Sequence, residues 1–163
     1  KYESGNFMPN MSSFNLNEIV RSIVITMEKR IREKNIVIDF KYEKSENIVE
    51  ADESAIYRVV QNLLDNALKF ASIGSEIEIS ITNKNGFAVF SIKNYGSSIS
   101  EEEQKYIWDR YYKADSSRSY HKKGTGLGLY IVKSIINQHN QEIEIKSDDN
   151  SVEFSFTLNL TNC

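Results

Sequence analysis

The chain has 163 residues, the usual size of one domain, and its 20 basic and 23 acidic residues leave a formal charge of −3. This acidic balance argues against general nucleic-acid binding, which needs a net basic face. The single Cys163 excludes an internal disulfide, and the two histidines are too few for most histidine-based metal centres. No apolar run approaches the length that spans a membrane, and no signal-peptide pattern is present. Because the chain starts at Lys1 without a Met, we expect a piece excised from a longer protein.

The first half of the chain predicts a linker, two helices and two strands. Residues 1–15 are polar, contain the only proline, and are expected to be a linker or the tail of a preceding element. From Asn17 to Lys34 apolar residues recur at steps of three and four, which is typical of one face of an amphipathic helix. The other elements expected here are, in order, strands at 36–42 and 48–51 and a helix at about 53–71 with Asp52 as its N-cap.

The second half contains more strands. The isoleucines of 77–81 alternate with polar residues, which is typical of a half-buried strand, and Asn85-Gly86 is the strongest short hairpin signal. Ser100 and Glu103 form a capping box that predicts a helix running to about Tyr112. The remaining elements are, in order, a returning strand at 87–94, a polar loop at 113–125, a helix at about 126–139, and a closing hairpin of strands at 142–147 and 152–160. Because this order is not a strict β-α-β alternation, it favours an α+β sandwich over a doubly wound sheet.

One face of the expected helix 53–71 is suited to a metal–phosphate group. Asn62, Asn66 and Lys69 are spaced by one turn each and share this face, with Asp65 beside them. An Asn oxygen can ligate Mg²⁺ and a Lys can pair with phosphate oxygens. On spacing alone, the alternative is the solvated polar face of an ordinary helix.

Three glycines, Gly124, Gly126 and Gly128, directly precede the expected helix 126–139. Glycines there let the backbone approach a phosphate, and a helix N-terminus offers free N–H groups. The basic residues Lys113 and Arg118 lie in the loop before it. The pattern is neither a Walker loop nor a Rossmann fingerprint, and a flexible hinge is the alternative.

Residues Asn94–Ile99 follow the hairpin strand. An amide at a strand end, followed by a glycine, is able to recognise the edge of a planar ring. A simple turn that ends the strand is the alternative.

Four segments, taken in order, resemble the N, G1, F and G2 boxes of the ATP-binding catalytic domain of bacterial sensor histidine kinases, a Bergerat fold. They are Asn62-Leu-Leu-Asp-Asn-Ala-Leu-Lys-Phe70, Asn94–Ile99, Ile107-Trp-Asp-Arg-Tyr-Tyr-Lys113 and Gly124–Leu129. The resemblance implies a two-layer α/β sandwich whose mixed, mostly antiparallel sheet is covered on one face by about three helices, with an ATP lid. It implies a catalytic domain at 16–160, a tail of a dimerisation hairpin at 1–15, and a C-terminal tail at 161–163.

The resemblance also implies the roles of individual residues. Asn66 would coordinate Mg²⁺ with support from Asn62, Lys69 would face the ATP phosphates, and Phe70 would pack near the nucleotide. Asn94 would read the adenine. Catalysis would rest on Mg²⁺ and on the cations Lys69, Lys113 and Arg118. The further nucleotide contacts implied are Gly96, Ile99, Gly124, Thr125, Gly126, Leu127 and Gly128, whereas Trp108, Tyr111 and Tyr112 are expected to anchor the lid by packing.

The chain departs from the family pattern at three places. Asn94 stands where the family has an adenine-reading Asp, and an amide accepts a hydrogen bond without charge assistance. Ser98 replaces a glycine, so that this turn should avoid a positive φ. Asn140-Gln141 replaces a glycine pair, which we expect to alter only a turn.

Asn62 also occupies the position where gyrase-type and anti-sigma-type members carry a glutamate base. Without a carboxylate to activate water, phosphoryl transfer fits better than efficient ATP hydrolysis. The alternatives are an anti-sigma-type serine kinase, or a degenerate module that acts through protein contacts.

The resemblance implies partners outside this sequence. The family phosphorylates a histidine followed by an acidic residue, but Lys122 follows His121 and Asn140 follows His139. We therefore expect the acceptor on a separate dimerisation hairpin, a response regulator as the next partner, and a homodimer in the full-length protein, with this piece monomeric. The expected location is the cytoplasmic side of a membrane-anchored sensor.

Overall fold

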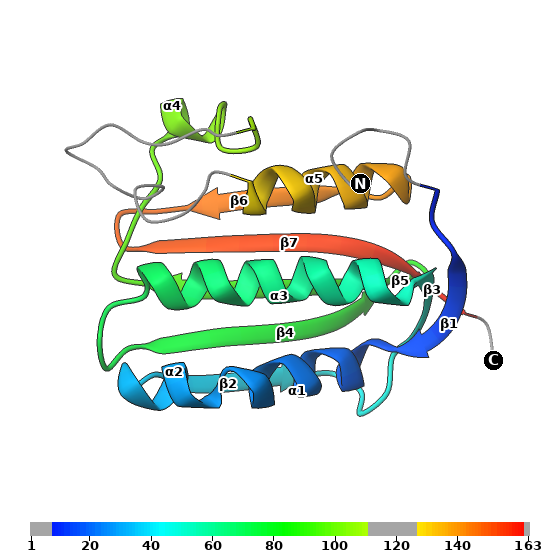
Figure 1. Cartoon of the computed structure of the whole chain (residues 1–163), viewed down its shortest axis with the longest axis horizontal. Helices are drawn as coiled ribbons and strands as arrows, with labels where there is room; N and C mark the ends of the chain where they lie inside the picture. The colour runs from blue at the N-terminus through cyan, green and yellow to red at the C-terminus, as the bar shows by residue number, and fades with distance from the viewer. Residues whose placement is uncertain (1–7, 111–126, 162–163) are drawn as a thin grey trace.

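The computed structural model describes residues 8–110 and 127–161, and their strands form one seven-stranded sheet (Figure 1). The strand order is β1-β3-β7-β5-β4-β2, and β6 also pairs with β7. Every pairing is antiparallel except that of β2 with β4. The strands are β1 (Met11–Asn15), β2 (Val37–Tyr42), β3 (Ile48–Asp52), β4 (Glu76–Lys84), β5 (Phe87–Tyr95), β6 (Ile143–Ser147) and β7 (Ser151–Leu160).

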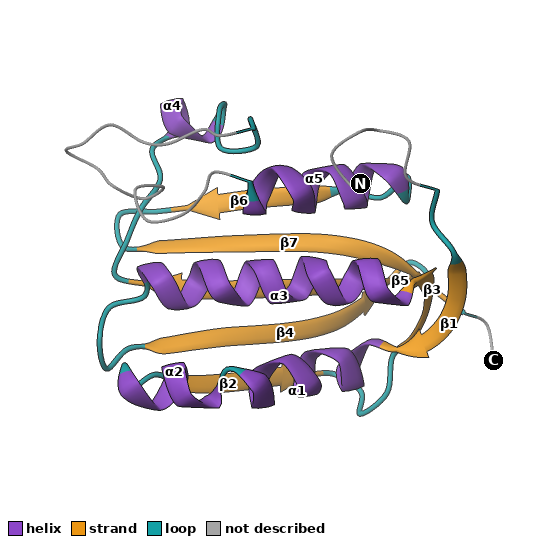
Figure 2. Ribbon diagram, in the orientation of Figure 1, coloured by secondary structure: helices purple, strands orange, loops and turns teal. Residues whose placement is uncertain are grey.

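The helices other than α4 pack on one face of this sheet, which gives the two-layer α+β sandwich that the sequence predicts, whereas α4 lies past β6 in this view (Figure 2). They are α1 (Leu16–Thr26), α2 (Glu28–Glu33), α3 (Glu53–Phe70), α4 (Glu101–Gln104) and α5 (Gly128–Gln138). The long α3 lies across the middle, and its buried stripe includes Leu63 and Leu64, which are about 0–1% exposed. Within the described ranges, no helix is long and apolar enough to cross a membrane.

Local sequence signals account for the elements that frame the site. The Asp52 side chain accepts a hydrogen bond from the Ala55 N–H and caps α3 as expected. Asn85 and Gly86 take φ values of 54° and 87°, the two positive values that a tight hairpin turn between β4 and β5 requires. The isoleucines of β4 are buried and alternate with half-buried polar residues, which confirms the predicted strand.

The single helix expected at 17–34 is divided into α1 and α2 at Met27. The Thr26 hydroxyl donates to the Ile23 carbonyl at 2.7 Å, a local bond that competes with the backbone ladder and bends helices. Ile23 before the break and Ile31 after it are both buried, so the apolar periodicity continues across the break. The periodicity therefore identified the buried face but not the break.

The helix expected from Ser100 to Tyr112 was wrong in its length. The capping box of Ser100 and Glu103 is present, but α4 ends at Gln104. Beyond it, the backbone N–H groups of Tyr106 and Asp109 donate to carbonyls three residues earlier, which is turn geometry rather than α-helix.

The structure corrects the last part of the linker expected at 1–15. Met11–Asn15 forms β1, an edge strand that pairs with β3. Most side chains of β1 are exposed, so the strand carries little hydrophobic signal in the sequence. Its order comes from pairing with a partner more than thirty residues away, as in the register of Asn15 with Ile48.

Candidate functional site

Three of the predicted motifs meet at one end of the sandwich. The C-terminal end of α3, the end of β5 and the start of α5 lie toward the same side, at the left in Figure 1. The backbone N–H of Ser72, just after α3, donates to the carbonyl of Tyr95 at the end of β5 at 2.9 Å. The sheet therefore brings together segments that are separate in the sequence.

Asn62 joins the polar face of α3 to the start of α5. Its Nδ2 donates to the Gly128 carbonyl over 3.3 Å. Asn66 follows one turn later on the same half-buried face. An ionised glutamate at position 62 would have no hydrogen to donate to that carbonyl. The amide found here therefore also has a structural role, because it joins α3 to α5.

The first turn of α5 presents backbone donors to this region. Leu127 is the N-cap residue. Its side chain accepts no hydrogen bond from the first N–H groups of the helix. Gly128 is the first helical residue, and a Cβ there would meet no atom within 4 Å. The backbone N–H groups at a helix N-terminus and the positive end of the helix dipole are suited to a phosphate.

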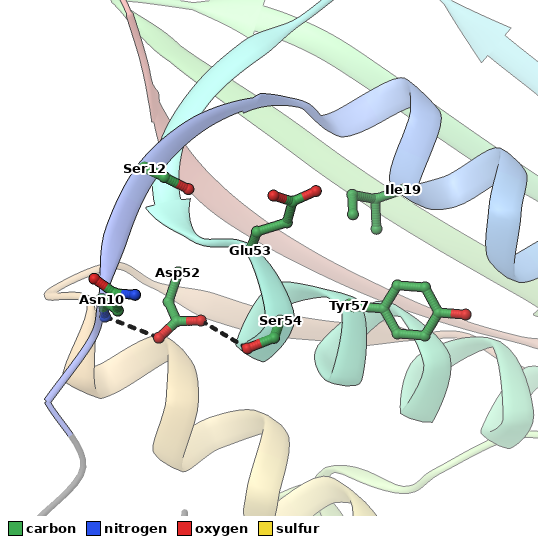
Figure 3. Close-up of a pocket in the computed structure, with 7 residues that line it drawn as sticks. All are labelled: Asn10, Ser12, Ile19, Asp52, Glu53, Ser54 and Tyr57. Atoms are coloured by element: carbon green, nitrogen blue, oxygen red, sulfur yellow. Dashed lines mark hydrogen bonds between the residues drawn. The ribbon is translucent and has the colours of Figure 1, made fainter.

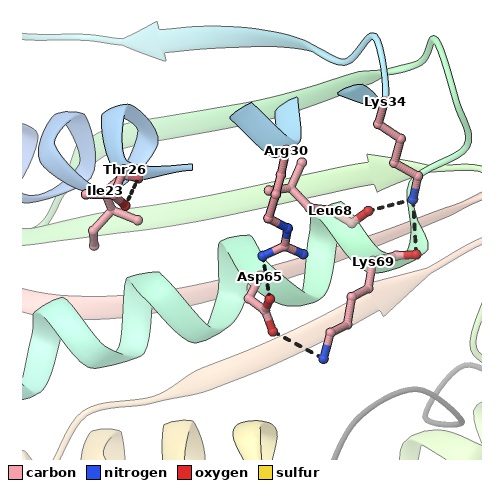
Figure 4. Close-up of polar contacts among 7 residues, drawn as sticks. All are labelled: Ile23, Thr26, Arg30, Lys34, Asp65, Leu68 and Lys69. Carbon is pink, nitrogen blue, oxygen red and sulfur yellow. Dashed lines mark hydrogen bonds and ion pairs between the residues drawn. The ribbon is translucent and has the colours of Figure 1, made fainter. Parts of the chain in front are cut away.

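Lys69 is part of an ion-pair network at the end of α3 (Figure 4). Its Nζ lies 3.4 Å from Asp65 Oδ2, while Arg30 from α2 lies 2.8 Å from Asp65 Oδ1. Lys34 Nζ donates to the carbonyls of Leu68 and Lys69 at 2.6 and 3.1 Å. These cations at the helix C-terminus stabilise α3 where its dipole is negative. Arg30 and Lys34 lie more than thirty residues from the residues they contact, so no local sequence pattern predicts their part in this network.

The segment after β5 is tightly held. Asn94 is 2% exposed, and its Nδ2 donates to Ser97 Oγ at 3.2 Å. Gly96 has a φ of 101°, and a Cβ there would lie 2.6 Å from the Cβ of Ser72. Ser98 is not among the described residues with positive φ, as expected for the residue that replaces a glycine. Ile99 is buried at 2% exposure and belongs to the hydrophobic core.

The remaining predicted residues divide into two groups. Trp108 packs edge-on against Phe154, with ring centroids 5.8 Å apart, and Phe70 packs against the core. Trp108 therefore packs against the core, and its role in anchoring the lid stays a prediction. The predicted residues Lys113, Arg118, Gly124, Thr125 and Gly126, together with Tyr111, Tyr112 and His121, lie outside the described residues.

His139 and Asn140 end α5 as structural residues. His139 is the C-cap of α5 and is 8% exposed. Asn140 takes a φ of 57°, the left-handed conformation in which glycine or asparagine commonly ends a helix. The departure from the family's glycine pair is therefore accommodated within a turn.

A separate cavity of about 440 Å³ lies at the opposite end of α3 (Figure 3). It lies near Asp52, Glu53 and Tyr57, roughly 18 Å along the helix axis from Asn66 at 1.5 Å per residue. Asp52 already accepts hydrogen bonds from Asn10 and Ser54. Two carboxylates would repel a phosphate, so this cavity does not fit a nucleotide triphosphate.

Comparisons with known proteins agree with this geometry. A family model described as histidine kinase-, DNA gyrase B- and HSP90-like ATPase matches residues 51–162. The histidine protein kinase SaeS of Staphylococcus aureus is 32% identical over 148 residues, which cover 90% of this chain and 41% of SaeS. The sensor histidine kinase YkoH of Bacillus subtilis is 32% identical over 137 residues, which cover 84% of this chain and 29% of YkoH.

Solved structures give the same result. The catalytic domain of histidine kinase ThkA has a TM-score of 0.83 and 30% identity, covering 94% of this chain and 99% of that domain. ThkA in complex with the response regulator protein TrrA has a TM-score of 0.78 and 27% identity, covering 94% of this chain and 42% of ThkA.

The chain therefore belongs to the family of histidine kinase-, DNA gyrase B- and HSP90-like ATPases. Within that family it is an ATP-binding catalytic module of the sensor histidine kinase type. It spans less than half the length of the curated relatives it matches. Neither a serine kinase nor a module without catalysis is favoured, because the matched relatives are sensor histidine kinases.

Proposed function

We propose that this domain binds Mg²⁺-ATP between the polar face of α3 and the start of α5. In the whole protein it would transfer the γ-phosphoryl group to a histidine on a dimerisation hairpin. The observation that carries the proposal is the hydrogen bond from Asn62 Nδ2 to the Gly128 carbonyl, because it sets an amide-rich helix face against a helix N-terminus.

The donors on α3 fit a magnesium ion. Mg²⁺ prefers oxygen ligands and usually retains water and phosphate oxygens in its shell. Asn66 offers an amide oxygen on the half-buried face of α3, one turn from Asn62. When bound, the ion would neutralise part of the phosphate charge. Lys69, 31% exposed at its side chain, would supply a further positive charge. Lys113 and Arg118 are proposed for the same task.

The base would be read at the end of β5. Asn94 Oδ1 is able to accept a hydrogen bond from the adenine amino group, since the described part of the chain provides it with no donor. Gly96 lets the backbone turn beside Ser72, and the buried Ile99 supplies apolar surface near the base.

The reaction would be transfer rather than hydrolysis. The bond from the γ-phosphorus to its bridging oxygen would break, a bond from phosphorus to an imidazole nitrogen would form, and ADP would leave. The rate would come from positioning and charge neutralisation, which dominate phosphoryl transfer. Asn62 is not a base, and Asp65 is paired with Arg30 and Lys69, so neither is suited to activating water.

Calorimetry of ATP binding with and without Mg²⁺ tests the site. Wild type should bind more tightly with Mg²⁺, and Asn66→Ala should lose this dependence. Asn137→Ala, an exposed amide on α5, is the matched control and should behave as wild type. An Asn66→Ala variant with an unchanged magnesium dependence would remove Asn66 from the site.

A second experiment tests the acceptor. The domain is mixed with a dimerisation hairpin of a sensor kinase that carries its histidine, and labelled ATP is added. Acid-labile phosphate on the hairpin supports the proposal, whereas acid-stable phosphate indicates a serine kinase. Binding of ATP without any transfer would indicate a module that acts by contacts alone. A response regulator, as in the ThkA–TrrA complex, is proposed as the next partner.

A further inference from the structure

The turn between β6 and β7 holds the segment that follows β5. The Gly96 N–H donates to the Asn150 carbonyl at 2.9 Å, and the Ser98 hydroxyl donates to the Asp148 carbonyl at 2.8 Å. The Ile99 N–H donates to Ser147 Oγ at 2.9 Å. Three bonds within four residues therefore join this segment to one turn.

The turn is itself well ordered. Asp148 Oδ1 accepts from the Asn150 N–H at 2.9 Å and from the Ser151 hydroxyl at 2.8 Å. These hydrogen bonds hold the pKa of the Asp148 carboxyl below its usual value. Ser147 Oγ donates to the Ser151 carbonyl at 2.8 Å, which fixes the hydroxyl that receives the Ile99 N–H. The turn is thus a rigid support for the neighbouring segment.

The opposite side of the segment is also fixed. Gly96 lies so close to Ser72 that a Cβ would approach the Ser72 backbone nitrogen to 2.8 Å. The backbone of 96–99 is therefore held between the end of α3 and the β6–β7 turn. Ser97, in the middle of this held segment, accepts the hydrogen bond from Asn94 Nδ2.

This bond has a consequence for base recognition, because an asparagine side chain carries both an acceptor and a donor. Its oxygen matches the 6-amino group of adenine, whereas its amino group matches the 6-carbonyl of guanine. An ionised aspartate can only accept hydrogen bonds, so it favours adenine in either orientation. The amide of Asn94 favours adenine only if its oxygen is turned toward the base. One Nδ2 hydrogen bound to Ser97 holds the amide with its amino group toward Ser97, so that Oδ1 is the atom turned to accept from the base.

We propose that Ser97, held in place by the β6–β7 turn through Ser147, orients the Asn94 amide and thereby makes the site selective for adenine over guanine. Ser97 and Ser147 are positioning residues, since they act through Asn94. The inference rests on the proposed function, because it concerns the same nucleotide site.

The first test needs no nucleotide. In the ¹⁵N-labelled chain, the side-chain NH₂ of Asn94 should shift and exchange faster in Ser97→Ala than in wild type. The Ile99 amide should exchange faster in Ser147→Ala, and Ser147→Thr should restore its protection. Ser155→Ala is the matched control, because Ser155 shares a 2.8 Å hydroxyl bond with Ser91 and lies opposite Ser91 in the register of β5 with β7. An Asn94 NH₂ signal that is the same in Ser97→Ala and wild type would overturn the inference.

The second test measures the affinities for ATP and GTP by calorimetry. Ser97→Ala should lower the ratio of ATP to GTP affinity by about fivefold or more, roughly the effect of one misplaced hydrogen bond. Ser147→Ala should lower the ratio by about threefold, and Ser155→Ala should leave it unchanged. A wild type that binds neither nucleotide would overturn the proposed function. A wild type that prefers ATP, with an equal preference in Ser97→Ala, would overturn only the role of Ser97.

Discussion

The imidazole of His139 accepts a hydrogen bond from the backbone N–H of Asp52, with Nε2 3.0 Å from the nitrogen. Its Nδ1 lies 2.8 Å from the Ile135 carbonyl and donates to it, the tautomer that this pair of contacts requires. One side chain therefore joins the end of α5 to the start of α3. Both helices contribute to the candidate nucleotide site at their opposite ends.

His139→Ala should destabilise the fold. It removes the acceptor of a buried N–H and a donor to a carbonyl, which costs about 1–3 kcal/mol. Urea unfolding measures this loss. Asn137→Ala, at an exposed position of the same helix, should change stability by less than about 0.5 kcal/mol. Equal stability of the two variants would show that the His139 contacts contribute nothing.

Asp52 should make stability depend on pH. Burial alone would raise the pKa of its carboxyl, but hydrogen bonds from Asn10, Ala55 and Ser54 and the nearby His139 together hold that pKa below its usual value. Because its pKa is lower in the folded state, the ionised Asp52 carboxylate stabilises the fold above about pH 4. This stabilisation is lost as the pH falls through the folded-state pKa.

Asp52→Asn keeps the oxygen that caps Ala55 but removes the charge and the oxygen that accepts from the Asn10 N–H, and should cost about 0.5–1 kcal/mol or more at pH 7. The difference from wild type should shrink below about pH 4, as measured by urea unfolding at several pH values. Asp149→Asn, in an exposed turn, is the control substitution. A difference at Asp52 that is constant down to pH 2 would contradict this explanation.

Gly96→Ala should be more damaging than Gly86→Ala. Both glycines have a positive φ, of 101° and 87°, so both substitutions strain the backbone by about 1–2 kcal/mol. Only at position 96 would the new Cβ collide with Ser72, 2.6 Å away, whereas position 86 has no atom within 4 Å. The collision should add about 1–3 kcal/mol.

Urea unfolding separates the two glycine variants, and ATP titration should show a loss of affinity in Gly96→Ala alone. Equal stabilities, or normal ATP binding by Gly96→Ala, would mean that the segment beside Ser72 shifts freely.

Asn94→Asp should bind ATP at least as tightly as wild type, up to about tenfold more tightly. A carboxylate accepts the adenine amino group with charge assistance, and the Ser97 hydroxyl is able to turn and donate to it. Asn94→Ala should bind more weakly. Calorimetry measures the ATP affinity of both variants. A marked loss of affinity in Asn94→Asp would contradict the assignment of Asn94 to adenine.

Much of the fold could be predicted because its signals are local. The alternation in β4, the Asn85-Gly86 turn and the Asp52 cap each depend on a few neighbouring residues. One failure came from a distant contact that overrides the local pattern, and the other was a helix length that the capping box does not set. β1 is ordered by pairing with β3, and α4 ends early although its capping box is formed.

For the site, the sequence by itself determined the chemical groups: two amides and an ammonium on α3, an amide near the end of β5, and glycines leading into α5. It also determined the family, because the order of those motifs is a property of the chain. Only the tertiary structure decided their arrangement. Asn62 reaches Gly128 across 66 positions, and Ser147 receives the Ile99 N–H across 48. Hydrogen bonds between such distant residues have no periodicity in the sequence, because the sheet and its helices set the distance between their atoms.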